Sequence, residues 1–246
     1  MLSQKKDVIL IVGGGSGIGK AIAEQLIELK EDIVIADINL NKWDSSSIIN
    51  VLFYQLDVTD EESINIMIEN FRTEDIYLKG LVYTVGKAVT LPLNSIKTKI
   101  YKELIELNTM SFFNLISKLA IQQLFSDQGA SIVVISSIVG QYGARGKIAY
   151  GLTKGAIDSG IKSLALEMAS NNIRVNAIAP GTVQTEMLDK LISSIGEEAV
   201  KKMLLDYPLG LGYPQDISDL AVFLLSKQSK WVTGSIITID GGYSAR

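Results

Sequence analysis

Seven short apolar runs rich in valine and isoleucine constrain the fold most strongly. They occupy residues 8–12, 33–36, 51–56, 80–85, 131–136, 174–179 and 235–239. Their hydrophobicity is continuous rather than alternating, which is typical of strands buried on both faces of a parallel sheet. Apolar positions at helical spacing follow Gly17 and recur from Ile157 to Met168, whereas residues 38–50 are too short and polar for a full crossover helix. The sequence therefore predicts an α/β chain with a doubly wound parallel sheet flanked by helices.

Composition indicates one globular domain over residues 1–246 and excludes several classes of partner. Hydrophobic residues make up 47% and charged residues 20% of the chain, as in ordinary soluble domains. The formal charge of −4 argues against nucleic-acid and anionic-membrane partners, because both attract basic surfaces. No apolar run approaches the roughly 20 residues that cross a bilayer. The apolar part of MLSQKKDVILIV is shorter than a secretory signal requires, so we expect a cytoplasmic protein.

The chain contains no cysteine and no histidine. These absences exclude a zinc site of the Cys/His type, a thiol nucleophile and any catalytic triad with a histidine base. We therefore expect no metal site. Chemistry must come from serine, threonine, tyrosine, lysine or carboxylate side chains, or from a bound cofactor.

The stretch VGGGSGIGK directly follows the first apolar run. Gly13, Gly17 and Gly19 fall between a predicted strand and a predicted helix. A tight turn there needs positive φ angles, and a phosphate can approach the backbone closely only where no Cβ intervenes. The free N–H groups and the dipole of the helix start would face that phosphate. Asp37 ends the second predicted strand, where a carboxylate can bind the adenosine ribose. The pattern predicts a dinucleotide site, with a glycine-rich turn that binds no ligand as the alternative.

Tyr150 and Lys154 lie four residues apart in AYGLTK, so they share one face of a predicted helix. A neighbouring ammonium favours the phenolate and brings the tyrosine pKa toward the neutral range, where proton exchange is efficient. Ser137 follows the run at 131–136 and lies at the carboxyl end of a predicted strand, where this architecture binds its ligands. The spacing predicts that hydroxyl, phenol and ammonium meet there.

The glycines follow the spacing G-x-x-x-G-x-G, and together with AYGLTK they resemble the short-chain dehydrogenase/reductase family. The resemblance covers essentially the whole chain and implies a single-domain Rossmann fold that forms a homotetramer. In that family, the serine matching Ser137 steadies the substrate oxygen and the tyrosine matching Tyr150 exchanges the proton. The lysine matching Lys154 tunes the tyrosine and binds the nicotinamide ribose, and the asparagine matching Asn108 supports a water-linked proton relay.

The resemblance also implies which residues bind the cofactor. Asp57 and Val58 match a pair that contacts adenine, and IRVNAIAPGTVQT matches the segment around the nicotinamide. Tyr83, Thr84 and Val85 stand where the family has Asn-Asn-Ala, so the polar contacts of that segment must be made otherwise. We expect cofactor contacts from Gly13, Gly15, Ser16, Gly17, Ile18, Asp37, Asp57, Val58, Thr84, Gly86, Tyr150, Lys154, Pro180, Gly181, Val183 and Thr185.

These observations predict an NAD(H)-dependent oxidoreductase that interconverts a secondary alcohol and a ketone, with Tyr150 as general acid and base. NAD(H) is expected rather than NADP(H), because the Asp37 carboxylate would repel a 2′-phosphate. One alternative is an NADPH-linked 3-oxoacyl-carrier-protein reductase. Another is a catalytically silent dinucleotide-binding protein.

Two further expectations concern the substrate and the assembly. Residues 186–213 mix apolar and charged side chains like an amphipathic helical lid over the site, with an ordinary pair of surface helices as the alternative. A helix over residues 101–125 carries more apolar positions than one core-facing stripe requires. We therefore expect a homo-oligomer that uses Leu104, Leu107, Phe112, Leu115 and Leu119.

Overall fold

The computed structural model describes residues 5–44, 50–192, 200 and 204–245. Its central element is one sheet of seven strands in the order β3-β2-β1-β4-β5-β6-β7. Every neighbouring pair is parallel. The strands are β1 (Lys6–Val12), β2 (Ile33–Asp37), β3 (Val51–Gln55), β4 (Ile76–Tyr83), β5 (Ala130–Ile135), β6 (Ile173–Pro180) and β7 (Ile236–Ile239).

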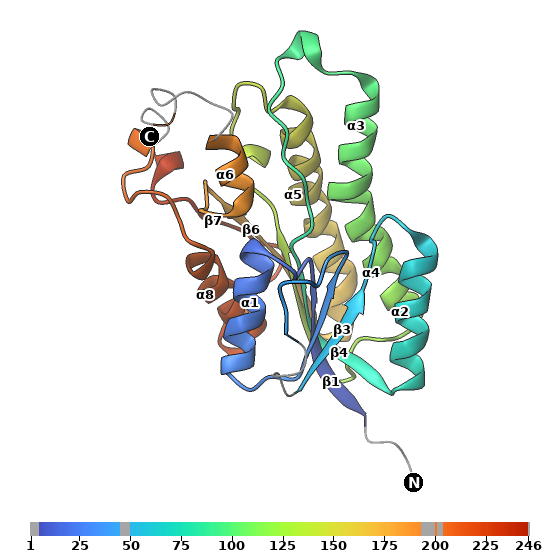
Figure 1. Cartoon of the computed structure of the whole chain (residues 1–246). Coiled ribbons are helices and arrows are strands. Elements are labelled where there is room, and N and C mark those ends of the chain that lie inside the picture. The colour runs from blue at the N-terminus through green and yellow to red at the C-terminus, as the bar shows by residue number, and fades with distance from the viewer. Residues whose placement is uncertain (1–4, 45–49, 193–199, 201–203, 246) are drawn as a thin grey trace.

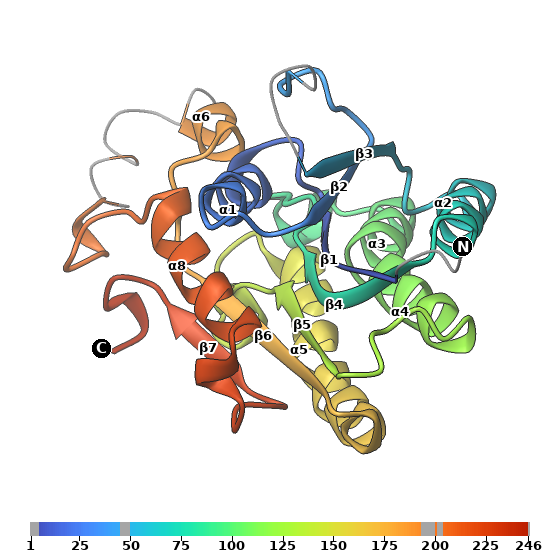
Figure 2. The same ribbon diagram turned by 90° about the horizontal axis from the view of Figure 1, so that it is seen from below.

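Helices cover both faces of this sheet (Figures 1 and 2). One face packs on α1 (Gly17–Glu28) and α8 (Pro214–Leu225), and the other on α2 (Glu61–Thr73), α4 (Ser111–Ile121) and α5 (Ile148–Met168). Two further helices are α3 (Thr98–Ile105) and α6 (Glu186–Ile192). Strand side chains feed two separate apolar cores, one on each face. The doubly wound α/β fold is therefore confirmed.

All seven predicted strands are present, and β4 differs most from its predicted bounds. It begins at Ile76 rather than at residue 80, because its first half alternates buried and partly buried residues instead of forming a continuous apolar run. Its pairing with β1 shifts between Val8 and Ile9. The Lys79 ammonium there forms an ion pair with Glu31 at 2.7 Å. The apolar pattern therefore placed the start of β4 too late, because the polar residue Lys79 interrupts it.

The predicted helix over residues 101–125 is present, but its ends and its internal geometry differ from the expectation. The structure shows α3, a π-helical turn (Glu106–Met110) and then α4, which ends at Ile121. Asn108 lies in the π-helical turn and is fully buried. Such turns inside longer helices often occur at functional sites. The sequence did not reveal the π-helical turn, because apolar periodicity does not report a one-residue insertion in the hydrogen-bond ladder.

The surplus of apolar residues on this segment was also an incorrect expectation. Leu104, Phe112, Leu115 and Leu119 are buried within the chain itself, and Leu107 packs against the same core. These side chains face the sheet and α5, so they leave no surplus for a partner. Within the described part of the segment, Met110 and Ile121 are the large apolar side chains that are exposed.

β1 lies between β2 and β4, so the chain reverses its direction of winding after β3. In open parallel sheets, ligands bind outside the carboxyl ends of the strands at this switch point. The glycine-rich loop follows β1 and the segment Thr84–Gly86 follows β4. The fold therefore brings both segments to the edge where a ligand is expected.

Candidate active site and dinucleotide cradle

The glycine-rich loop is shaped by close backbone approach. Gly13 and Gly17 have φ angles of +86° and +52°, a region that L side chains rarely adopt. A Cβ at Gly13 would lie 3.0 Å from the Val85 backbone nitrogen. Ser16 precedes α1, and its side chain makes no capping hydrogen bond with any residue that the structure describes. The first N–H groups of α1 therefore remain available, which fits the phosphates of a dinucleotide.

Asp37 connects the end of β2 to this loop. Its carboxylate accepts hydrogen bonds from the Gly15 N–H at 2.8 Å and from the Asn39 N–H at 2.9 Å. A carboxylate has acceptor capacity for further donors, so Asp37 can also bind ribose hydroxyls. Asp57 lies just beyond β3, where it accepts from the Thr59 N–H and hydroxyl, and the adjacent Val58 is buried.

Thr84, a predicted cofactor contact, hydrogen-bonds to the backbone at the start of the glycine-rich loop. Its hydroxyl lies 3.0 Å from the Val12 carbonyl oxygen and 2.9 Å from that of Gly13. The preceding residue, Tyr83, points into the core and bonds to the Ser111 hydroxyl at 2.7 Å. Thr84 therefore braces the glycine-rich loop against β4, and its direct contact with a cofactor stays a prediction.

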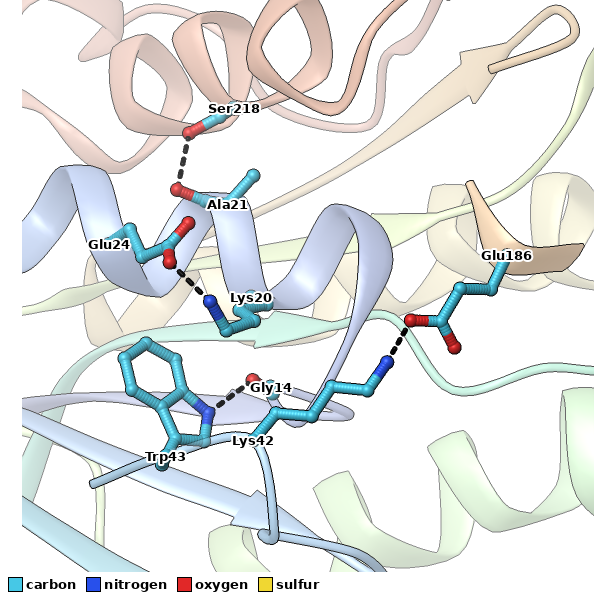
Figure 3. Close-up of polar contacts among 8 residues, drawn as sticks. All are labelled: Gly14, Lys20, Ala21, Glu24, Lys42, Trp43, Glu186 and Ser218. Carbon is cyan, nitrogen blue, oxygen red and sulfur yellow. Dashed lines mark hydrogen bonds and ion pairs between the residues drawn. The ribbon is translucent and has the colours of Figure 1, made fainter. Parts of the chain in front are cut away.

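The polar link after β2 folds over the glycine-rich loop, a contact that local sequence patterns did not predict (Figure 3). The Trp43 indole donates to the Gly14 carbonyl at 3.0 Å, and the Lys20 ammonium lies 5.0 Å from the centroid of its ring. Lys42 forms an ion pair with Glu186 at the start of α6. Among the described residues 38–44 and 50 there is no helix, as predicted. A lone tryptophan in a polar link was the only signal for this contact.

The segment after β6 faces the glycine-rich loop from the other side. Pro180 ends β6, and a Cβ at Gly181 would lie 2.9 Å from both the Asp240 Cα and the Tyr207 ring. Val183 is buried, while the Thr185 methyl lies 3.5 Å from the Cβ position of Gly17. The predicted lid begins here with α6, and its residues 193–199 and 201–203 lie outside the described residues.

Ser137 and Tyr150 meet beyond the carboxyl end of β5. Ser137 begins a short 3₁₀ turn (Ile138–Gly140), where its Oγ accepts from the Val139 N–H at 3.2 Å. Tyr150 lies in the first turn of α5. Burial raises the pKa of the Tyr150 phenol, and its side-chain hydrogen bond with Ser137 lowers that pKa. The sequence expectation that these two hydroxyls lie together is thus met in the structure.

Lys154 completes this group from the next turn of α5. Its buried ammonium donates to the Ile135 carbonyl at 2.7 Å and lies 6.0 Å from the centroid of the Tyr150 ring. Burial lowers the pKa of Lys154 to about 8, against the opposing effect of Asp158. Gly86 leaves room beside it, because a Cβ there would lie 3.4 Å from the Lys154 nitrogen.

Asp158 is a buried carboxyl that sequence reasoning missed. It accepts from the Ser136 hydroxyl at 2.5 Å. Burial raises its pKa, while the Ser136 hydrogen bond and the Lys154 charge lower it. It lies one helical turn beyond Lys154, so this i, i+4 spacing was the available signal. Asp158 therefore joins α5 to the strand end that carries Ser137.

Asn108 reaches the same region from the π-helical turn. Its amide nitrogen donates to the Lys87 carbonyl at 3.0 Å and to the Thr153 hydroxyl at 3.1 Å, and its oxygen accepts from the Lys87 N–H at 2.8 Å. The side chain thus holds the segment after β4 beside α5. Its role in a water-linked relay stays a prediction.

The comparisons with known proteins agree with this architecture. A sequence model described as enoyl-(acyl carrier protein) reductase matches residues 13–244. The 3-oxoacyl-[acyl-carrier-protein] reductase FabG of Thermotoga maritima is 33% identical over 242 residues, which cover 96% of each chain. A tropinone reductase homolog of Arabidopsis thaliana is 32% identical, over 96% of this chain and 74% of its own.

Solved structures are similar over nearly the whole length. A 4-hydroxyisoleucine dehydrogenase mutant complexed with NADH and succinate superposes with a TM-score of 0.90 at 29% identity, covering 98% of this chain and 99% of that one. ElxO with bound NADP gives a TM-score of 0.86 at 33% identity, covering 99% and 100%. These matches extend from the glycine-rich loop to the last strand, and they include nicotinamide-dependent oxidoreductases. The chain therefore belongs to the short-chain dehydrogenase/reductase family.

Proposed function

We propose that the protein is an NAD(H)-dependent oxidoreductase that interconverts a secondary alcohol and a ketone. The observation that carries this proposal is the grouping of Ser137, Tyr150 and Lys154 beyond the end of β5, at the same sheet edge as the glycine-rich loop. When bound, the nicotinamide would supply the hydride donor or acceptor. The loop, Asp37 and the segment 180–185 would hold the dinucleotide.

The side chains of the site divide the remaining work. In the reducing direction, Tyr150 donates its phenolic proton to the substrate oxygen, while the Ser137 hydroxyl hydrogen-bonds to that oxygen as its negative charge grows. The Lys154 ammonium stabilises the resulting phenolate, because opposite charges in a buried site interact strongly. Asn108 keeps the segment after β4 in place beside them, and we retain it as the candidate for the proton relay.

Replacement of Tyr150 by phenylalanine tests this proposal. General acid–base catalysis contributes about 10²- to 10⁴-fold to rates, so Tyr150→Phe should lower kcat by at least about 100-fold. NADH affinity, measured by fluorescence titration, should change little because the loop is untouched. An unchanged kcat on a ketone substrate would overturn the assignment. The matched control is Tyr142→Phe, since Tyr142 is exposed.

We infer that NAD(H) is preferred over NADP(H). Two backbone N–H groups hold the Asp37 carboxylate, which would meet the adenosine ribose, and like charges in close contact are strongly unfavourable. The kcat/KM for NADH should exceed that for NADPH by at least about tenfold. Asp37→Asn should reduce the difference in kcat/KM between NADH and NADPH, while the amide oxygen can still accept a hydrogen bond from the Gly15 N–H.

Two other functions remain as candidates. A 3-oxoacyl-carrier-protein reductase is favoured by the similarity to FabG and predicts efficient turnover with NADPH and a carrier-bound thioester. A catalytically silent dinucleotide-binding protein is favoured by the altered segment Tyr83–Val85, and it predicts NADH binding without reduction of any ketone in a broad panel.

We also infer that the protein is cytoplasmic and forms a homo-oligomer. Light scattering, which measures the mass of the particle in solution, tests the assembly. No helix in the described part of the chain is long and apolar enough to cross a bilayer. Ile121 at the end of α4 and Leu166 on α5 are 73% and 81% exposed, and contact with a second copy would remove such apolar side chains from water. A mass well above 26.7 kDa is expected. A mass equal to that value would contradict the inference.

A further inference from the structure

Lys147 places a second ammonium group beside Tyr150. It is the residue before α5, three positions before Tyr150, and residues at this spacing are neighbours on a helix surface. The Lys147 ammonium lies 5.9 Å from the centroid of the Tyr150 ring, compared with 6.0 Å for that of Lys154. Two cations therefore flank the phenol, and the roles proposed above use only Lys154.

Lys147 combines partial burial with the lack of an ion pair to a carboxylate among the residues that the structure describes, whereas the other described lysines without such a pair, Lys154 apart, are exposed. Six other lysines form ion pairs with aspartate or glutamate, namely Lys5, Lys20, Lys42, Lys79, Lys99 and Lys118. The Lys147 side chain is partly buried, and burial lowers its pKa. Desolvating an ammonium without a counter-charge is unfavourable. A bound anion would compensate this cost.

We propose that Lys147 binds a carboxylate of the substrate, so that the substrate is a small oxo acid or its hydroxy acid. This inference rests on the proposed function, because it requires the reacting oxygen to meet the Tyr150 hydroxyl. A substrate held there would place its carboxylate beside the Lys147 ammonium, which lies 5.9 Å from the centroid of the same ring. A carboxylate close to the reacting carbon would accept a charge-assisted hydrogen bond from Lys147.

The alternative anion is the phosphate of a carrier-bound thioester, and the position of Lys147 argues against it. In such a substrate the ketone is separated from the phosphate by the whole pantetheine arm. One lysine next to Tyr150 cannot contact that phosphate while the ketone meets the phenol. The geometry therefore favours an acid whose charge lies near its reacting carbon.

Matched acids and esters test the proposal. The probes are 2-oxobutanoate, acetoacetate and levulinate, each beside its methyl ester, and the protein is the full chain with NADH. Binding to the NADH complex is measured by calorimetry and reduction by loss of NADH absorbance. At least one acid should bind more tightly than its ester. Lys147→Met should raise the Kd of that acid by about 10- to 100-fold, the usual effect of losing a hydrogen bond to a charged group. The Kd of the ester should stay within about threefold of its wild-type value.

The controls separate charge from folding. Lys147→Arg should retain most of the preference for the acid. Arg145→Met removes the same charge from an exposed position two residues away, and it should not alter the preference. Circular dichroism and NADH titration establish that each variant is folded.

Acids that bind no better than their esters, or a preference that survives in Lys147→Met, would overturn the inference. So would reduction of a carrier-bound 3-oxoacyl thioester with the same kcat/KM in Lys147→Met and wild type while every acid fails. Failure of the proposed function has a different signature, in which NADH binds and no ketone of either kind is reduced.

Discussion

The glycine-rich loop and the junction of β5 with α5 lie at the same edge of the sheet, but their polar side chains have different environments. In the loop, the side chains of Asp37, Thr84 and Trp43 all bond to loop backbone. At the junction, Lys154 and Asp158 are buried charged groups, and both have shifted pKa values.

This difference suggests two kinds of function, binding through fixed backbone groups in the loop and proton chemistry at the junction. The loop presents a fixed set of N–H groups, so its function depends on backbone position and tolerates little added volume. The junction instead retains ionisable groups in a poorly solvated environment, and perturbed pKa values of this kind cluster at functional sites. Substitutions in the two regions should therefore fail differently, by loss of cofactor affinity in one and by altered catalysis in the other.

The largest effect is expected from Gly19→Ala. The added Cβ would overlap the Gly13 carbonyl oxygen and would lie 2.6 Å from the Thr84 hydroxyl. Overpacking of this kind costs about 1–3 kcal/mol, so urea unfolding should show that loss and NADH titration should show weakened binding. Gly143→Ala is the matched control, because nothing lies within 4 Å of its Cβ position. A Gly19→Ala protein with wild-type affinity would show that the loop is not rigid.

Thr84→Val tests the brace between β4 and the loop. Valine keeps the shape of threonine but leaves the Val12 and Gly13 carbonyls without their hydroxyl partner. The loss should be about 1–2 kcal/mol in the free energy of unfolding, with weaker NADH binding and little change in kcat. Thr84→Ser keeps the hydroxyl and should restore binding. If kcat falls while affinity holds, Thr84 belongs to the reactive region instead.

Asp158→Asn probes the junction without removing volume. The amide can still accept from Ser136, but the charge that raises the pKa of Lys154 is gone. The Lys154 pKa should then fall below its present value of about 8. Because the charged form of Lys154 assists Tyr150, the alkaline decline of kcat should move to lower pH. An unshifted pH–rate profile would show that Asp158 acts only as a structural tether.

The last prediction concerns how the stability of the protein depends on pH. The Lys154 pKa is about 8 in the folded chain, below the ordinary lysine value of 10.5, so between these two pH values the unfolded chain binds more protons. Stability contributed by this group therefore rises with pH through that window. As pH rises above about 8, the free energy of unfolding of the wild type should increase relative to that of Lys154→Met. A constant difference would mean that Lys154 is solvated in the folded state.

Local patterns were sufficient to predict the strands, the glycine-rich loop and the grouping of the proposed catalytic side chains. Continuous apolar runs marked all seven strands, and the glycine spacing marked the turn into α1. Ser137, Tyr150 and Lys154 could be placed together because carboxyl ends of parallel strands share one edge. Asp158 and Lys147 were missed, since their helical spacing from Lys154 and Tyr150 is common on many helices.

What the sequence by itself determined is the order and type of the elements and the residues at their carboxyl ends, because periodicity and glycine placement act over a few neighbours. Tertiary structure alone decided that Trp43 lies over Gly14, that Thr84 braces the loop and that Leu104 and Phe112 belong to the core. It also decided the charge behaviour of Lys154 and Lys147, since desolvation depends on every segment packed around a group. Contacts between distant segments leave no local periodicity to read.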